Sequence, residues 1–248
     1  MRIYITGIST LVIGLFMMGA TCSPLSPPAF APSKSLMNFS DESFNYRLYG
    51  GCVRSVWDIN GEGAGIEVEY SANQNGLGIN AFFGNGSGPF KNKNSLLETG
   101  LFLTKYYGDK EDFLLMAFEP RLDMAFITNE SASIIPNILV HYSLVFHPFE
   151  IKFTLRGGTS RVVNRGKPII VEEIESISLF GSSDDKPVYI QSYLLDTVFL
   201  GLDIGLLYHF NGMYAGFSLV YMHISAEENH DYDNYWVSPM VIFGHSIY

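Results

Sequence analysis

The sequence predicts an all-β protein, a closed antiparallel transmembrane β-barrel of about ten strands. From about residue 44 onward, polar and apolar residues alternate with period two, the pattern of a strand with two different faces. The apolar sets are about ten residues long, which is what a tilted strand needs to cross a bilayer. The connections alternate between short and long, as in outer-membrane barrels. The sheet should close, because open edges cannot face lipid.

The composition supports a membrane protein. The chain of 248 residues is 47% apolar and only 16% charged, whereas soluble domains carry about 25% charged residues. Aromatic residues reach 15%, which suits strands. The net charge of −10 argues against a nucleic-acid partner, which would require a basic surface. No long internal apolar run is available for a transmembrane helix.

The N-terminal segment 1–21 predicts a signal peptide. Its start, "MRIYITGISTLVIGLFMMGATC", has one Arg, a long apolar run and then small residues. An uncleaved membrane anchor is the alternative, because the run is long. The letters "GATC" resemble a bacterial lipobox, in which Cys22 would be acylated, although cleavage after Ala20 is equally consistent.

Residues 22–40 predict a Pro- and Ser-rich linker, and residues 41–248 predict the barrel. Cys22 lies at the processing site and Cys52 stands alone, so the sequence offers neither a disulfide framework nor a metal cluster. No cofactor is expected.

Ten strands follow from the alternation and the connections between them. The stretch 113–127, "FLLMAFEPRLDMAFI", places Leu114, Met116 and Phe118 on one face and Glu119, Arg121 and Asp123 on the other. Eight strands remain possible if the region 44–84 is read differently. The expected strands are 44–57, 64–72, 77–84, 95–107, 113–127, 137–147, 150–158, 197–210, 213–225 and 236–248.

The connections give the barrel two different rims. Those at 73–76, 109–112, 147–150 and 209–212 are tight, and Asn211-Gly212 is a strong two-residue hairpin signal. The others are long and polar. The longest, 159–194, contains its own apolar run and predicts a hairpin above the membrane or a further strand pair. An even strand number puts both ends of the barrel on the short-turn side.

The inward faces predict a filled polar lumen. A barrel of eight to ten strands is just wide enough for side chains, and mixed charges at high density indicate paired residues rather than a pore. His141 and Ser143 should join this network beside Glu150. A narrow channel for small solutes is the alternative. The expected inward charges are Glu67, Glu69, Glu98, Glu119, Arg121, Asp123, Glu150, Lys152, Arg156 and Asp203.

One outward face ends in two polar residues. In "FSLVYMHISAEENHDYDNYW", the lipid-facing set Phe217, Leu219 and Tyr221 continues in phase to His223 and Ser225. A serine with a histidine two residues away on one strand face has the elements of a nucleophile and its base, and Asp233 in the following loop could orient the imidazole. Interfacial polar residues at the end of the apolar surface are the alternative reading.

This stretch resembles the PagL family of lipid A 3-O-deacylases over residues 217–236. "SLVYMHIS" is similar to that family's S-L-x-Y-x-H-x-S strand. The resemblance implies His223 as base, Ser225 as nucleophile and Asp233 as orienter. The chain departs from the family at Ala226, where the family has Asn for the oxyanion hole. It also carries Asp in place of Glu, several residues early, and more strands than the family's eight.

The function predicted from these features is that of a small, non-catalytic barrel in the bacterial cell outer membrane. Its role would be surface interaction or membrane structure. Its partners would be outer-membrane lipid and an extracellular ligand bound through loops 159–194 and 226–235. A lipid deacylase using His223 and Ser225 and a narrow solute channel are the alternatives.

Overall fold

The computed structural model describes residues 34–37, 42–55, 60–87, 93–109, 112–127, 130–167, 169–173, 188–227 and 234–247. The predicted signal peptide, Cys22, the rest of the linker and Asp233 lie outside these residues. No helix in the described part of the chain is long and apolar enough to cross a bilayer.

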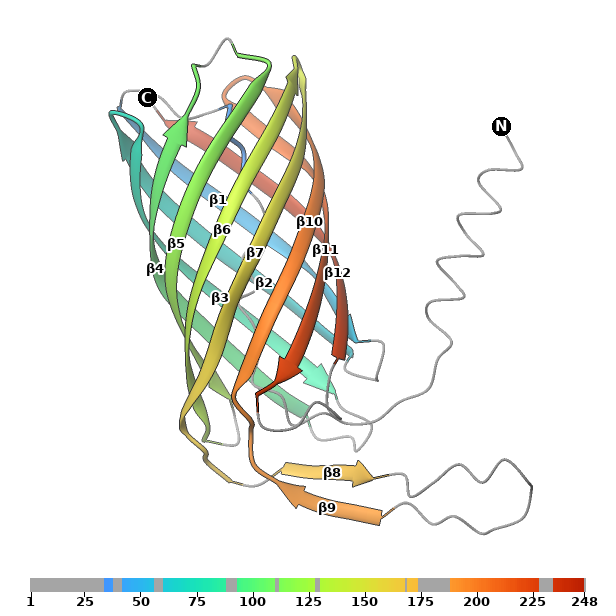
Figure 1. Ribbon diagram of the computed structural model, residues 1–248. Helices are drawn as coiled ribbons and strands as arrows, with labels where there is room; N and C mark the ends of the chain where they lie inside the picture. The colour runs from blue at the N-terminus through green and yellow to red at the C-terminus, as the bar shows by residue number, and fades with distance from the viewer. Residues whose placement is uncertain are drawn as a thin grey trace, which may run out of the picture.

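Ten long antiparallel strands close into one barrel (Figure 1), in the order β1-β12-β11-β10-β7-β6-β5-β4-β3-β2. Two short strands form a separate antiparallel hairpin beyond the barrel. The barrel strands are β1 (Glu42–Ser55), β2 (Asn60–Ala72), β3 (Asn75–Ser87), β4 (Lys93–Tyr107), β5 (Leu114–Ile127), β6 (Ala132–Phe146), β7 (Phe149–Asn164), β10 (Thr197–Phe210), β11 (Met213–Ala226) and β12 (Asn234–Ile247), and the hairpin strands are β8 (Ile169–Glu173) and β9 (Val188–Ser192).

The ten predicted strands are confirmed, and the eight-strand alternative is wrong. The largest differences lie at the long-loop rim, where β6 begins at Ala132 rather than 137 and β7 runs to Asn164 rather than 158. The alternation fades there because a strand that has left the lipid no longer needs an apolar outer face. The backbone hydrogen bonds between the strands nevertheless continue. The hairpin β8–β9 confirms the reading of 159–194 as an additional hairpin, at the long-loop end of the barrel (Figure 1).

The outer wall is apolar and tall enough for a membrane. A strand of 14 residues is about 46 Å long at about 3.3 Å per residue, and a tilt of about 40° leaves a height of about 35 Å. Large apolar side chains on this wall are 37–70% exposed, among them Phe217, Leu200 and Leu101. Exposed apolar surface of this extent needs lipid around it.

The short turns and the closing seam have clear local causes. Asn211 and Gly212 both have positive φ, 51° and 75°, as a two-residue hairpin turn matching the strand twist requires. β1 pairs with β12 from Phe44 to Gly51, and again at Arg54 and Ser55. Pro239 lies between these runs and has no backbone N–H to donate. The Ser238 hydroxyl instead donates to the Cys52 carbonyl oxygen, at 3.0 Å.

Candidate functional site

The inner wall is densely charged. Twelve charged side chains in the described residues are buried at 4% exposure or less, and all ten predicted inward charges are among them. The two further members are Lys34 and Arg47, which the sequence reasoning missed. The set holds seven carboxylates and five cations, so most of the charge is compensated within the lumen.

Arg121 on β5 lies at the centre of this network. Its Nη1 donates to Glu67 at 3.0 Å and to Glu119 at 2.7 Å. Its Nε lies 3.5 Å from Asp123, and its guanidinium covers the ring of Phe102 at 4.7 Å from the centroid. Glu67 also accepts a hydrogen bond from Arg47 at 2.6 Å, which ties β1, β2 and β5 together across the lumen.

Glu150 on β7 forms a second node nearer the short turns. One of its oxygens accepts from Ser143 at 2.6 Å, and the other lies 2.8 Å from the His209 ring nitrogen. The predicted network of Ser143 and Glu150 is therefore confirmed. His141 lies elsewhere, with its Nδ1 2.9 Å from the Thr154 hydroxyl and its Nε2 3.6 Å from Glu119.

Much of the rest of the lumen is occupied by an apolar cluster that the sequence did not predict. More than half of its buried members come from β11 and β12, and others reach it from β5, β6 and β10. Towards the long loops it therefore extends across the barrel. Its residues there include Ala125, Ile135, Phe199, Ile224 and Trp236. The lumen thus has a charged wall facing an apolar one.

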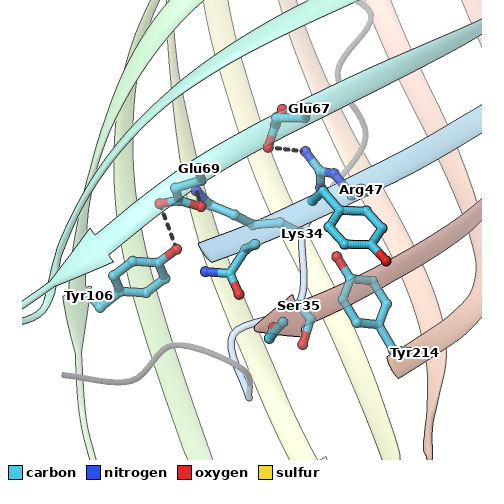
Figure 2. Close-up of a pocket in the computed structure, with 10 residues that line it drawn as sticks. Lys34, Ser35, Arg47, Glu67, Glu69, Tyr106 and Tyr214 are labelled. Carbon is cyan, nitrogen blue, oxygen red and sulfur yellow. Dashed lines mark hydrogen bonds and ion pairs between the residues drawn. The ribbon is translucent and has the colours of Figure 1, made fainter. Parts of the chain in front are cut away.

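Residues 34–37 lie inside the barrel, where the sequence had predicted part of a linker. The Lys34 ammonium contacts Glu69 at 3.1 Å and Thr104 at 2.6 Å, and it forms an ion pair with Glu119 (Figure 2 shows Lys34 beside Glu69). The Leu36 side chain is fully buried against Tyr106, Leu115 and Ala117. The predicted inward set held seven carboxylates against three cations, and this imbalance is the sequence signal for further inward cations, which are Arg47 on β1 and Lys34.

Ser35 and Leu36 are held by Glu150. The Ser35 hydroxyl donates to one Glu150 oxygen at 2.7 Å, and the Leu36 backbone N–H donates to the other at 2.8 Å. These four residues therefore contact β2, β4, β5 and β7 at once. A cavity of about 20 Å³ lies beside Lys34 and Ser35, lined also by Arg47 and Tyr214 (Figure 2). This volume has room for about one water molecule.

His223 and Ser225 lie on the outer face of β11 near the long-loop rim, both half-buried. They pair across the sheet with Leu200 and Val198 of β10, and the His223 ring stacks on Tyr235 at a centroid distance of 4.7 Å. Ala226, which stands where the PagL family has Asn for the oxyanion hole, is fully buried within the apolar cluster. Whether Asp233 approaches His223 lies outside the described residues.

Two described carboxylates at this rim belong to a different cluster. Asp196 and Glu227 both pair with Arg161 on β7, with Asp196 at 3.2 Å. Asp196 also accepts from the Val162 backbone N–H at 2.8 Å. Within the described part of the chain, no group of three or more His, Cys, Asp or Glu side chains could hold a metal ion.

Comparison with known proteins shows fold similarity alone. Neither a protein-family model nor a curated protein sequence matches the chain. The neisserial surface protein A is 10% identical, over 84% of this chain and 97% of that one, with a TM-score of 0.34. The β domain of the Bordetella autotransporter BrkA is 9% identical, over 84% and 100%, with a TM-score of 0.45. The attachment invasion locus protein of Yersinia pestis is 11% identical, over 83% and 97%, with a TM-score of 0.29.

Proposed function

We propose that this protein is a non-catalytic outer-membrane β-barrel with a lumen closed to solutes, and that it acts in surface interaction or membrane structure. The observation that carries the proposal is the filled lumen. In the described part of the chain, twelve charged side chains are buried there at 4% exposure or less, and an apolar cluster occupies much of the remaining space. A pore would need a continuous hydrated path, which ion pairs and apolar side chains in a narrow barrel do not leave.

The outer wall and the two rims support the location. Its strands, about 35 Å tall, are long enough to contain the apolar band of about 25 Å that outer-membrane barrels present to lipid. In that membrane, short turns face the periplasm and long loops face outward. The long-loop end would therefore face the cell exterior, with the hairpin β8–β9 and the loop 226–235.

The outward end offers charge for an interaction. The loop 226–235 carries Glu227, Glu228, Asp231 and Asp233 and no Lys or Arg. An acidic loop of this kind favours a basic partner, because complementary charge steers association and selects against acidic surfaces. A ligand that contacts the loop 226–235 would accordingly be cationic, whereas the loop 159–194, the other predicted ligand site, carries both signs of charge.

The experiment is conductance of the purified, refolded protein in planar bilayers. A closed lumen predicts membranes that stay at baseline, while the same preparation shows folded protein by its strand-rich circular dichroism. Large, stable conductance steps from the monomer would contradict the proposal and favour the channel alternative instead.

The deacylase alternative is less favoured. His223 and Ser225 share a face, but the Ala226 side chain is buried in the wall and supplies no oxyanion donor. The side chains around the pair, Leu200, Val198 and Tyr235, are those of an interfacial belt. The catalytic roles of His223, Ser225 and Asp233 stay a prediction that substitution can test.

A further inference from the structure

The surroundings of Lys34 have the properties of a binding site for a primary ammonium group. Three oxygen-bearing side chains, Glu69, Thr104 and Glu119, surround its Nζ. An ammonium group has three N–H donors, so these three acceptors match its capacity. The carboxylates also supply opposite charge in a place largely shielded from bulk water, since both are at 4% exposure or less.

Two aromatic rings complete the enclosure. The Nζ of Lys34 lies 4.8 Å from the centroid of Phe102 and 5.4 Å from that of Tyr106. Rings at this range attract a cation through their negative faces. The Tyr106 hydroxyl donates to Glu69 at 2.7 Å, which fixes both the ring and the carboxylate. The site is therefore built by β2, β4 and β5, and not by the segment that fills it.

The neighbouring side chains bind the residues that follow the ammonium-bearing lysine. Glu150 accepts one hydroxyl and one backbone N–H from the next two residues. Tyr106, Leu115 and Ala117 then enclose an apolar side chain two residues after the lysine. The small cavity beside Lys34 is also lined by Asn45 and Ser246, which lie near the start of β1 and the end of β12. It thus adjoins the short-turn rim.

Arg47 adds a second polar feature beside that cavity. Its Nε and Nη1 are buried and have no hydrogen-bond partner among the described residues. The oxygen of a water molecule in the cavity would accept from them. The cavity next to the ammonium group has room for about one water molecule and is not filled by protein atoms.

We propose that the short-turn half of the lumen is a receptor site for a primary alkylammonium group, and that Lys34–Met37 occupies it in cis. The cage of Glu69, Thr104 and Glu119 under Phe102 and Tyr106 recognises the ammonium. The pocket of Tyr106, Leu115 and Ala117 recognises an apolar side chain two residues later. The site stands apart from the long-loop end to which the proposed function assigns the interaction. It rests on the proposed function in one respect: the apolar cluster closes the lumen on the long-loop side, so the site is a pocket with a closed end.

The test is chemical rescue of a truncated lysine. Lys34→Ala removes the atoms beyond Cβ, which n-propylammonium replaces. The unfolding midpoint of the refolded variant in urea should fall below that of the wild type. Added n-propylammonium should recover more than half of this shift, while tetramethylammonium, which has no N–H donor, should recover almost none at the same concentration. The wild-type midpoint should not respond to either ion.

Lys34→Met is the matched control. It fills the space of the lysine side chain without its charge, so it should be destabilised and n-propylammonium should not rescue it. Rescue of both variants, of neither, or equally by both ions would overturn the proposal. Conductance of Lys34→Ala should stay at baseline. If the wild type conducts while the rescue succeeds, the closed-lumen function fails and the ammonium site stands.

A measurement on the wild-type protein covers the case in which Lys34→Ala does not fold. Amine-reactive acylation of the folded barrel, read by mass spectrometry, should modify Lys167, whose side chain is 71% exposed, and spare Lys34, whose side chain is 5% exposed. Protection of Lys34 should disappear in Glu69→Gln/Glu119→Gln, which keeps the size of both side chains but removes the charges of the cage. Acylation of Lys34 in the wild type as fast as of Lys167, or unchanged protection in the double variant, would contradict an ammonium site.

Discussion

Replacing Arg121 by Met tests whether the lumen network stabilises the barrel as a connected unit. The guanidinium is the shared partner of Glu67, Glu119 and Asp123, at 3.0, 2.7 and 3.5 Å from the nearest atoms. Methionine retains most of the apolar stem of the side chain but leaves these carboxylates with less compensation. Removing one partner of a buried ion pair costs roughly 3–5 kcal/mol. Because three carboxylates lose the same partner here, we expect the upper part of that range.

The matched control is Arg161→Met at the long-loop rim. Arg161 also pairs with two carboxylates, Asp196 and Glu227, but its side chain is 49% exposed. Water and salt screen such a pair, so its loss should destabilise the barrel much less than the loss of Arg121. The two variants thus make the same chemical change at a buried and at an exposed site.

The assay is urea unfolding in lipid vesicles, followed by the fluorescence of the two tryptophans. Folded protein is checked by its faster migration on unheated gels. A loss of less than about 1 kcal/mol for Arg121→Met, or equal losses at Arg121 and Arg161, would contradict a buried network centred on Arg121. Either result would mean that water enters the lumen and solvates these carboxylates.

Three further outcomes are expected. Gly78→Ala should lower the unfolding free energy by about 1–3 kcal/mol, because its new Cβ would lie 2.1 Å from the Phe102 ring, whereas Gly157→Ala meets its nearest atom at 3.6 Å and should be nearly neutral in the same urea assay. Ser225→Ala and His223→Ala should leave folding and membrane lipid composition unchanged; acyl release from lipid A by the wild type that disappears in Ser225→Ala, measured by mass spectrometry, would establish the deacylase alternative. The refolded protein should show mainly strand by circular dichroism in detergent, and a mainly helical spectrum would contradict the barrel.

Much of the barrel was predictable because lipid and lumen make opposite demands on neighbouring residues. Leu202 and Ile204 face lipid while Asp203 between them is fully buried inside, and this contrast recurs in most strands. Where the strands leave the membrane, the contrast weakens, so the start of β6 and the end of β7 were placed several residues short. The backbone hydrogen bonds between strands continue there, but they do not depend on residue type and so cannot be predicted from the sequence pattern.

The content of the lumen was only partly predictable. The two-residue alternation of a strand predicts that Glu119 and Asp203 point into the lumen, but it does not predict which inward side chains contact each other across the barrel. His141 was expected beside Glu150, yet it contacts Glu119 and Thr154 because the partner depends on strand stagger. Lys34 belongs to no strand, and only the excess of inward carboxylates pointed to it. On the outer face, phase correctly placed His223 and Ser225, while their chemistry depends on residues beyond the strand.

The position of Lys34–Met37 constrains the order in which the barrel assembles. This segment lies only a few residues before β1, and β1 closes the cylinder by pairing with β12, with Phe44 opposite Ile247. These partners lie about two hundred residues apart in the chain, so their pairing is among the slowest contacts to form. Before the seam closes, the segment can dock on the open inner face of the sheet, whereas afterwards it could enter only through the end of the barrel. Its contacts to β2, β4, β5 and β7 would then form first and hold half of the curved sheet in shape while the last strands arrive. Deleting residues 34–37 should accordingly slow insertion into vesicles more than it speeds unfolding.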